Sequence, residues 1–61
     1  MDPNANLERQ LEITKELERL LDVGYERDVL LVELASELVE LVNGLDGWIK
    51  GGGFLPTRWQ R

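Results

Sequence analysis

The stretch from residue 29 to residue 49 is apolar at thirteen of its twenty-one positions, and its few polar residues fall largely on one narrow stripe. That polar stripe consists of Glu33, Glu37, Glu40, Asn43 and Gly44. Its spacing of three and four residues matches an α-helix and runs too long for a typical strand. A helix with so little polar surface must be covered over most of its circumference. The sequence therefore predicts a helix over 28–50 that needs packing partners on more than one side.

A first helix is predicted over 3–22, followed by a turn over 23–27. Asp2 can cap its first turn, and Pro3 suits the first helical position because an N–H is not needed there. Gly24 ends the pattern, as glycine does after many helices. Ile13 lies off the centre of the apolar stripe, and Thr14 fills a gap in it. The stripe expected to face the second helix is Leu7, Leu11, Leu17, Leu20 and Leu21.

Two helices joined by a short turn should lie antiparallel, so we expect an all-α, two-helix hairpin in a single domain over 1–61. Gly44 and Gly47 weaken the second helix, but the apolar periodicity continues across both, which favours one continuous helix. The glycine triplet at 51–53 ends that helix and acts as a hinge for the tail over 51–61. The tail is too apolar for a solvated end and should fold back. Its expected anchors are Phe54, Leu55 and Trp59.

The sequence lacks the side chains that most catalytic and metal sites need. It contains no Cys and no His, which excludes disulfides, zinc sites built from thiolates or imidazoles, and the commonest catalytic bases. Ser36 is the only serine, and no lysine lies near it in the sequence to activate it. The glutamates at 33, 37 and 40 lack the Glu-x-x-His pair of di-metal bundles. We therefore expect no enzymatic activity, no cofactor and no metal.

The charge of the chain argues against two classes of partner. Its net charge of −5 is unfavourable for binding nucleic acid or an anionic membrane, and no stretch is long and uncharged enough to span a bilayer. All twelve acidic residues lie before residue 51, whereas Arg58 and Arg61 make the tail basic. The tail can thus dock on its own acidic body or present a small positive patch to a partner.

Self-association is the strongest expectation from the sequence. The first helix can cover only one side of the second, which leaves an apolar flank that is too large for a monomer. Two-fold pairing through this flank would give a homodimer with a four-helix bundle. Higher even-numbered oligomers and an obligate complex with an unrelated protein are the alternatives. The flank consists of Val32, Ala35, Val39, Val42 and Ile49.

The C-terminal half carries a resemblance to a known group of proteins. Three segments carry it: Leu38-Val39-Glu40-Leu41-Val42, then Leu45-Asp46-x-Trp48-Ile49, then Gly52-Gly53-Phe54-Leu55-Pro56 followed by Trp59. The chain resembles a family of small acidic proteins encoded by actinobacterial phages and prophages, and the opening at residues 2–5 fits the same family. The resemblance implies a source in such phages and a place in the cytoplasm of the bacterial host. It implies no activity and no site residue.

Two functions remain as hypotheses. The first is a small structural or interaction protein that self-associates and binds another protein of the phage or its host. The alternative is an acidic inhibitor of a host factor, or a mimic of nucleic acid, whose carboxylates imitate phosphates. The carboxylate rows available for that purpose are Glu8, Glu12 and Glu16 on the first helix, and Glu33, Glu37 and Glu40 on the second.

Overall fold

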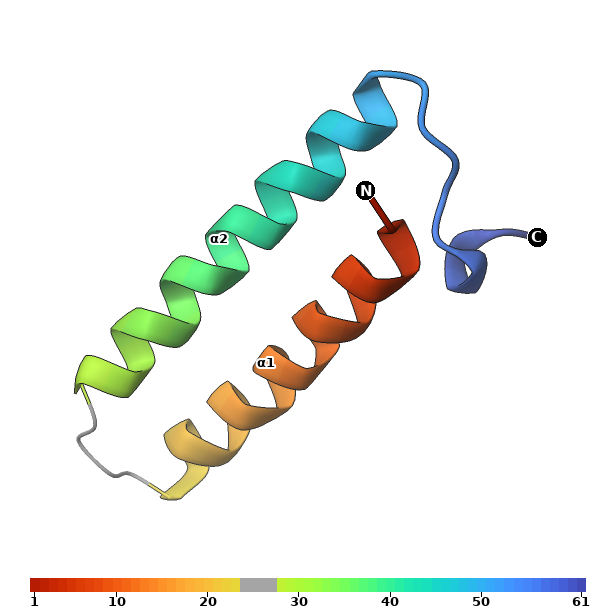
Figure 1. The fold of residues 1–61 in the computed structure, drawn as a ribbon. Coiled ribbons are helices and arrows are strands. Elements are labelled where there is room, and N and C mark those ends of the chain that lie inside the picture. Colours follow the sequence, from red (N-terminus) through yellow and green to blue (C-terminus); the bar gives the residue numbers. More distant parts are fainter. Residues whose placement is uncertain (24–27) are drawn as a thin grey trace.

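The computed structural model describes residues 1–23 and 28–61, which form an α-helical hairpin followed by a returning tail (Figure 1). Helix α1 spans Pro3–Val23, α2 spans Asp28–Lys50, and a short 3-10 helix, η1, spans Thr57–Trp59. Within the described residues every regular element is helical. Helix α2 has the bounds expected from the sequence, and α1 runs one residue further. The turn predicted over 23–27, with its helix stop at Gly24, otherwise lies outside the described residues.

The start of α1 is held by a side-chain cap. The Asp2 carboxylate accepts hydrogen bonds from the N–H groups of Asn4 and Ala5, at 2.9 and 3.2 Å. Pro3 occupies the first helical position directly after this cap. The cap satisfies N–H groups that have no partner inside the helix, and a carboxylate there also suits the helix dipole.

The buried apolar residues of the hairpin differ from the leucine stripe expected for α1. Ile13 and Leu20 are 1% and 3% exposed, whereas Leu21 is 72% exposed. The prediction that Leu21 faces α2 and that Ile13 lies off the stripe is therefore wrong. Residues seven apart, such as Ile13 and Leu20, nearly coincide around a helix, whereas Leu21 lies about 100° from Leu20, at the margin of the side that is covered. Leu45 of α2 is similarly buried.

Polar contacts between the helices define how they are aligned. The Asn6 side-chain amide donates to the backbone carbonyl of Leu41 at 3.0 Å. One turn further along α1, Arg9 forms a two-pronged contact with the Glu37 carboxylate, at 2.6 and 2.9 Å. The contacted residue number falls along α2 as it rises along α1, which is the antiparallel arrangement visible in Figure 1.

The C-terminal end of α2 is closed by a glycine motif. The Gly53 N–H donates to the carbonyl of Trp48 at 2.8 Å, and the Gly52 N–H donates to that of Ile49 at 3.1 Å. Gly52 has a φ of +93°, a left-handed conformation that glycine adopts without steric cost. These features are those of a Schellman motif, which satisfies helix carbonyls and reverses the chain.

Beyond this motif the tail lies along the first turns of α1, on the side away from α2 (Figure 1). The Thr57 N–H donates to the Asn4 side-chain carbonyl at 2.6 Å, and Pro3 and Pro56 are both fully buried. The expected anchors Phe54, Leu55 and Trp59 remain 59%, 41% and 49% exposed. A short tail crossing a single helix buries only the residue at the crossing, which here is Pro56.

Candidate interaction surface

The five residues of the predicted flank lie at positions 32, 35, 39, 42 and 49 on one side of α2, and we call them the valine row. Val32, Val39 and Val42 are 64%, 58% and 46% exposed, Ala35 is exposed, and Ile49 is partly buried. Spacings of three, four and seven residues are those of the a and d positions of a coiled coil. The hairpin thus places these side chains on one face of α2 and leaves most of that face uncovered.

The valine row lies opposite the ionic edge of the hairpin. Glu37 pairs with Arg9, and it lies about 200° around the helix from Val39, two residues further on. The Arg9 guanidinium, which donates two hydrogen bonds to Glu37, holds the pKa of that carboxyl below its usual range and raises the pKa of Arg9. The ion pair of Arg9 with Glu37 and the valine row therefore lie on opposite sides of α2.

A charged residue interrupts the row near its C-terminal end. Asp46 lies between Val42 and Ile49 in the same periodicity, and its carboxylate contacts the Lys50 ammonium at 2.9 Å. Both of these side chains are well exposed to solvent. The unbroken apolar part of the row therefore runs from Val32 to Val42.

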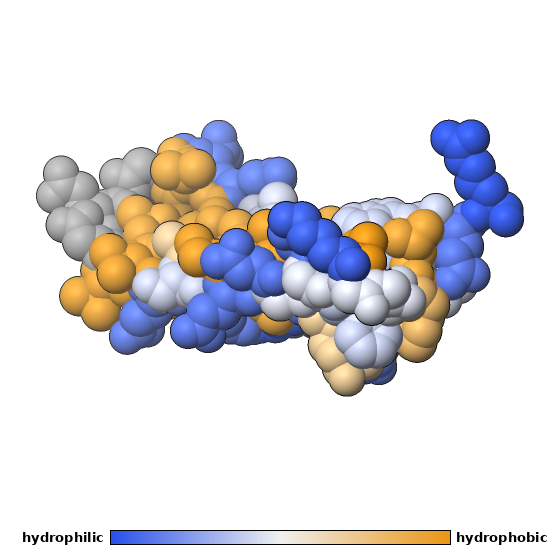
Figure 2. All heavy atoms as spheres, turned by 90° about the horizontal axis from the view of Figure 1, so that it is seen from above, coloured by the Kyte–Doolittle hydropathy of each residue, from blue (hydrophilic) through white to orange (hydrophobic). Residues whose placement is uncertain are grey.

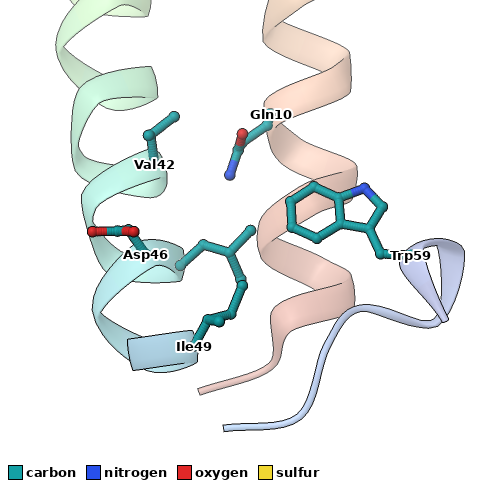
Figure 3. A pocket seen from close by; sticks show the side chains of 6 residues that line it. Gln10, Val42, Asp46, Ile49 and Trp59 are labelled. Carbon is teal, nitrogen blue, oxygen red and sulfur yellow. The ribbon is translucent and has the colours of Figure 1, made fainter. Parts of the chain in front are cut away.

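A groove of about 220 Å³ adjoins this end of the row, between the two helices and the tail (Figure 3). Its walls come from all three segments, with the Gln10 amide from α1 and the Trp59 indole from the tail pointing toward the α2 side chains. Val42 and Ile49 belong both to the groove and to the valine row. The lining residues are Gln10, Val42, Leu45, Asp46, Ile49 and Trp59.

Further apolar side chains are exposed around the end of the hairpin next to residues 24–27. Leu21, Val23 and Val29 are each at least half exposed. Figure 2 shows apolar surface gathered at that end and continuing along the molecule, interrupted by polar side chains. Val29 is 73% exposed but lies about 60° around α2 from Val32, on the side away from Ala35 and Val42.

The carboxylate rows are partly neutralised by the chain itself. Arg9 also contacts Glu12 at 3.3 Å, in addition to Glu37, and Arg19 pairs with Glu16. On the outer face of α1 a second hollow of about 470 Å³ is lined in part by Glu8, Glu12, Glu18 and Lys15 of the helix and by Arg58 of the tail. Arg58 of the basic tail therefore shares this hollow with acidic side chains of α1.

Two further kinds of site are not present in residues 1–23 and 28–61. No three His, Cys, Asp or Glu side chains in that part of the chain are grouped so that they could hold a metal ion. Neither described helix combines the length and apolarity required to cross a membrane.

The groove contains residues that sequence reasoning did not assign to an interaction surface. Asp46 could have been found by continuing the spacing of three and four from Val42 to Ile49. Gln10 and Trp59 carry no such signal, because only the fold brings α1, α2 and the tail together at this point.

Comparisons with known proteins found no relative of this chain. No family model, curated protein or solved structure matches the chain. What the surface can bind must therefore be derived from its own geometry.

Proposed function

We propose that this chain is a self-associating protein-interaction module, in which two hairpins pair through the valine row to form a four-helix bundle. The observation that carries the proposal is the row itself, a regular series of apolar side chains that a single hairpin leaves open to solvent. Coiled-coil spacing on a straight helix is the pattern by which two helices interlock.

A two-fold axis near residue 37 would align two α2 helices antiparallel. Val32 of one copy then lies opposite Val42 of the other, and Ala35 lies opposite Val39. The central pairs set the small Ala35 against the larger Val39, which lets the two helices approach closely there. Asp46 and its partner Lys50 fall beyond the end of this seam, so their ion pair stays in solvent.

The valines supply a substantial part of the association energy. Full burial of a valine-sized side chain is worth about 1.5–3 kcal/mol, and Val32, Val39 and Val42 still have roughly half of that to gain. Six such side chains from two copies contribute on the order of 6 kcal/mol, whereas association costs about 4–15 kcal/mol. A stable dimer therefore needs apolar contacts beyond the three valines.

Sedimentation velocity over a series of protein concentrations tests the proposal. The wild-type chain should sediment as a dimer at micromolar concentrations, and Val39→Glu should convert it to a folded monomer, because each new carboxylate would be buried against Ala35 of the other copy without a partner. Val29→Glu is the matched control: it adds the same charge to the same helix, at a more exposed position off the row, and should leave the dimer intact. A wild-type chain that stays a folded monomer throughout would contradict the proposal.

The wider role in this proposal is binding another protein of the phage or its bacterial host, in the host cytoplasm. Only the resemblance to phage-encoded proteins supports that setting. The alternative, an acidic mimic of nucleic acid, is less favoured because Glu12, Glu16 and Glu37 already pair with arginines of the chain. A mimic needs carboxylates that remain free to meet the basic groups of its target.

A further inference from the structure

We infer that Trp59 belongs to the self-association surface: a second copy of the chain covers the groove, so that the docked tail forms one edge of the dimer interface. This inference rests on the proposed pairing through the valine row. It assigns an interaction role to a residue of the tail, which the sequence alone marks only as an anchor.

The first support is that the tail is held by other contacts than the Trp59 side chain. Pro56 is fully buried, and the Thr57 N–H is bonded to Asn4 at 2.6 Å. These contacts position the short helix that carries Trp59, while half of the Trp59 surface stays in solvent. Aromatic side chains placed in this way, with one face against the protein and one free, are typical anchors of protein interfaces.

The second support is the continuity of the groove with the valine row. Val42 and Ile49 line the groove and also belong to the row. A second copy that packs against Val42 therefore approaches the groove as well, and the Trp59 indole forms the opposite wall (Figure 3). The valine row alone offers little apolar area for a stable dimer. The half-exposed Trp59 side chain is the largest apolar side chain that borders the row at the groove.

The third support is that the Asp46 carboxylate and the Gln10 side-chain N–H group, both at the groove, already have partners within the chain. The Asp46 carboxylate is paired with Lys50 at 2.9 Å. The Gln10 side-chain amide donates to the Asn6 side-chain carbonyl at 2.7 Å. A second copy that covers the Val42 and Trp59 side of the groove therefore leaves no unpaired charge behind, while the ion pair of Asp46 and Lys50 stays at the solvent-exposed end.

The two indole N–H groups make a direct test possible in the intact wild-type chain. Trp48 lies on the Glu37 side of α2, and its indole N–H donates to the Phe54 carbonyl, so it serves as an internal reference. In ¹H–¹⁵N correlation spectra the Trp59 indole signal should shift with protein concentration, following the dimerisation measured by sedimentation. The Trp48 signal should stay in place. The variant Trp59→Phe assigns the two signals.

Matched variants give a second, independent measurement. Trp59→Ala should raise the dissociation constant of the dimer by about tenfold or more, because much of the apolar surface at the edge is removed. Arg58→Ala is the control: it truncates the neighbouring residue of the same short helix, whose side chain lines the other hollow, and should change the constant by no more than about twofold.

The outcomes separate the inference from the proposed function. A dimer that forms with an unchanged Trp59 signal, and that Trp59→Ala does not weaken, would overturn the inference and leave the valine row as the seam. Such a result would leave the groove to a small apolar ligand or to another protein. A chain that remains monomeric at every concentration would overturn both.

Discussion

A Cβ atom added to Gly53 would overlap the indole ring of Trp48. The ring lies over the backbone at Gly53, donates its N–H to the Phe54 carbonyl at 2.9 Å, and meets the Phe54 ring edge to face at 5.5 Å. Trp48 thus packs against the chain reversal after α2, at Gly53 and Phe54. The tail leaves α2 in a direction that only glycine at position 53 permits.

Substituting Gly53 by alanine should therefore destabilise the protein. Overlap with a packed ring typically costs about 1–3 kcal/mol, because either the ring or the backbone has to move. Gly47→Ala is the matched control: a Cβ there meets nothing within 4 Å, and alanine favours a helix by about 1 kcal/mol over glycine. Thermal unfolding should show a lower Tm for Gly53→Ala and a higher one for Gly47→Ala. Equal shifts in one direction would contradict the role given to Trp48.

Replacing Asn4 by alanine should loosen the tail. The Asn4 side chain accepts the Thr57 N–H across 53 residues of sequence, and a hydrogen bond of this kind contributes about 1 kcal/mol. Amide hydrogen exchange at Thr57 should become faster, with α1 and α2 protected as before. Asn43→Ala, at an exposed position on α2, should leave the exchange at Thr57 unchanged. Unaltered protection in Asn4→Ala would show that the bond does not hold the tail.

Deleting residues 54–61 should lower the Tm by several degrees. The deletion removes the buried Pro56 and the contacts to Asn4 and Trp48, and about 1 kcal/mol corresponds to roughly 4–8 °C in a domain of this size. Removing only Arg61, whose side chain is exposed, is the control and should have little effect. If the longer deletion leaves the Tm unchanged, the tail is a free binding peptide.

Stability should fall in acid through Glu37. Its pKa is lowered in the folded chain by the hydrogen bonds from Arg9, so folding is favoured by the ionised form. This contribution is fully present above the ordinary glutamate pKa of about 4.5 and is lost as the pH falls through the lowered value. Urea unfolding at a series of pH values should show a shallower acid loss for Glu37→Gln than for the wild type.

The control for the acid experiment is Glu40→Gln. Glu40 lies one turn along α2, and its removal takes away a carboxylate that takes no part in the Arg9 contact. The variant should retain the pH dependence of the wild type in the region of the lowered pKa. Identical profiles for Glu37→Gln and the wild type would show that the contact between Arg9 and Glu37 contributes nothing to stability.

The sequence by itself determined the two helices and the end of α2. Leucine and valine at spacings of three and four specify a helix because they place apolar side chains on one side of a structure with 3.6 residues per turn. The glycines at 51–53 end α2 because the left-handed turn at Gly52 and the close approach of Trp48 require residues without a Cβ. These are local properties, and local sequence is enough to predict them.

Only the tertiary structure decided which apolar residues of these helices are buried. Periodicity predicts the apolar side of a helix but not where another segment packs against it. Ile13 is therefore buried in the core, whereas Leu21 is exposed. The path of the tail likewise depends on contacts between distant residues, such as Asn4 with Thr57. For this reason Pro56 is buried and Trp59 lines the same groove as Val42, because burial at each position depends on which segments meet there.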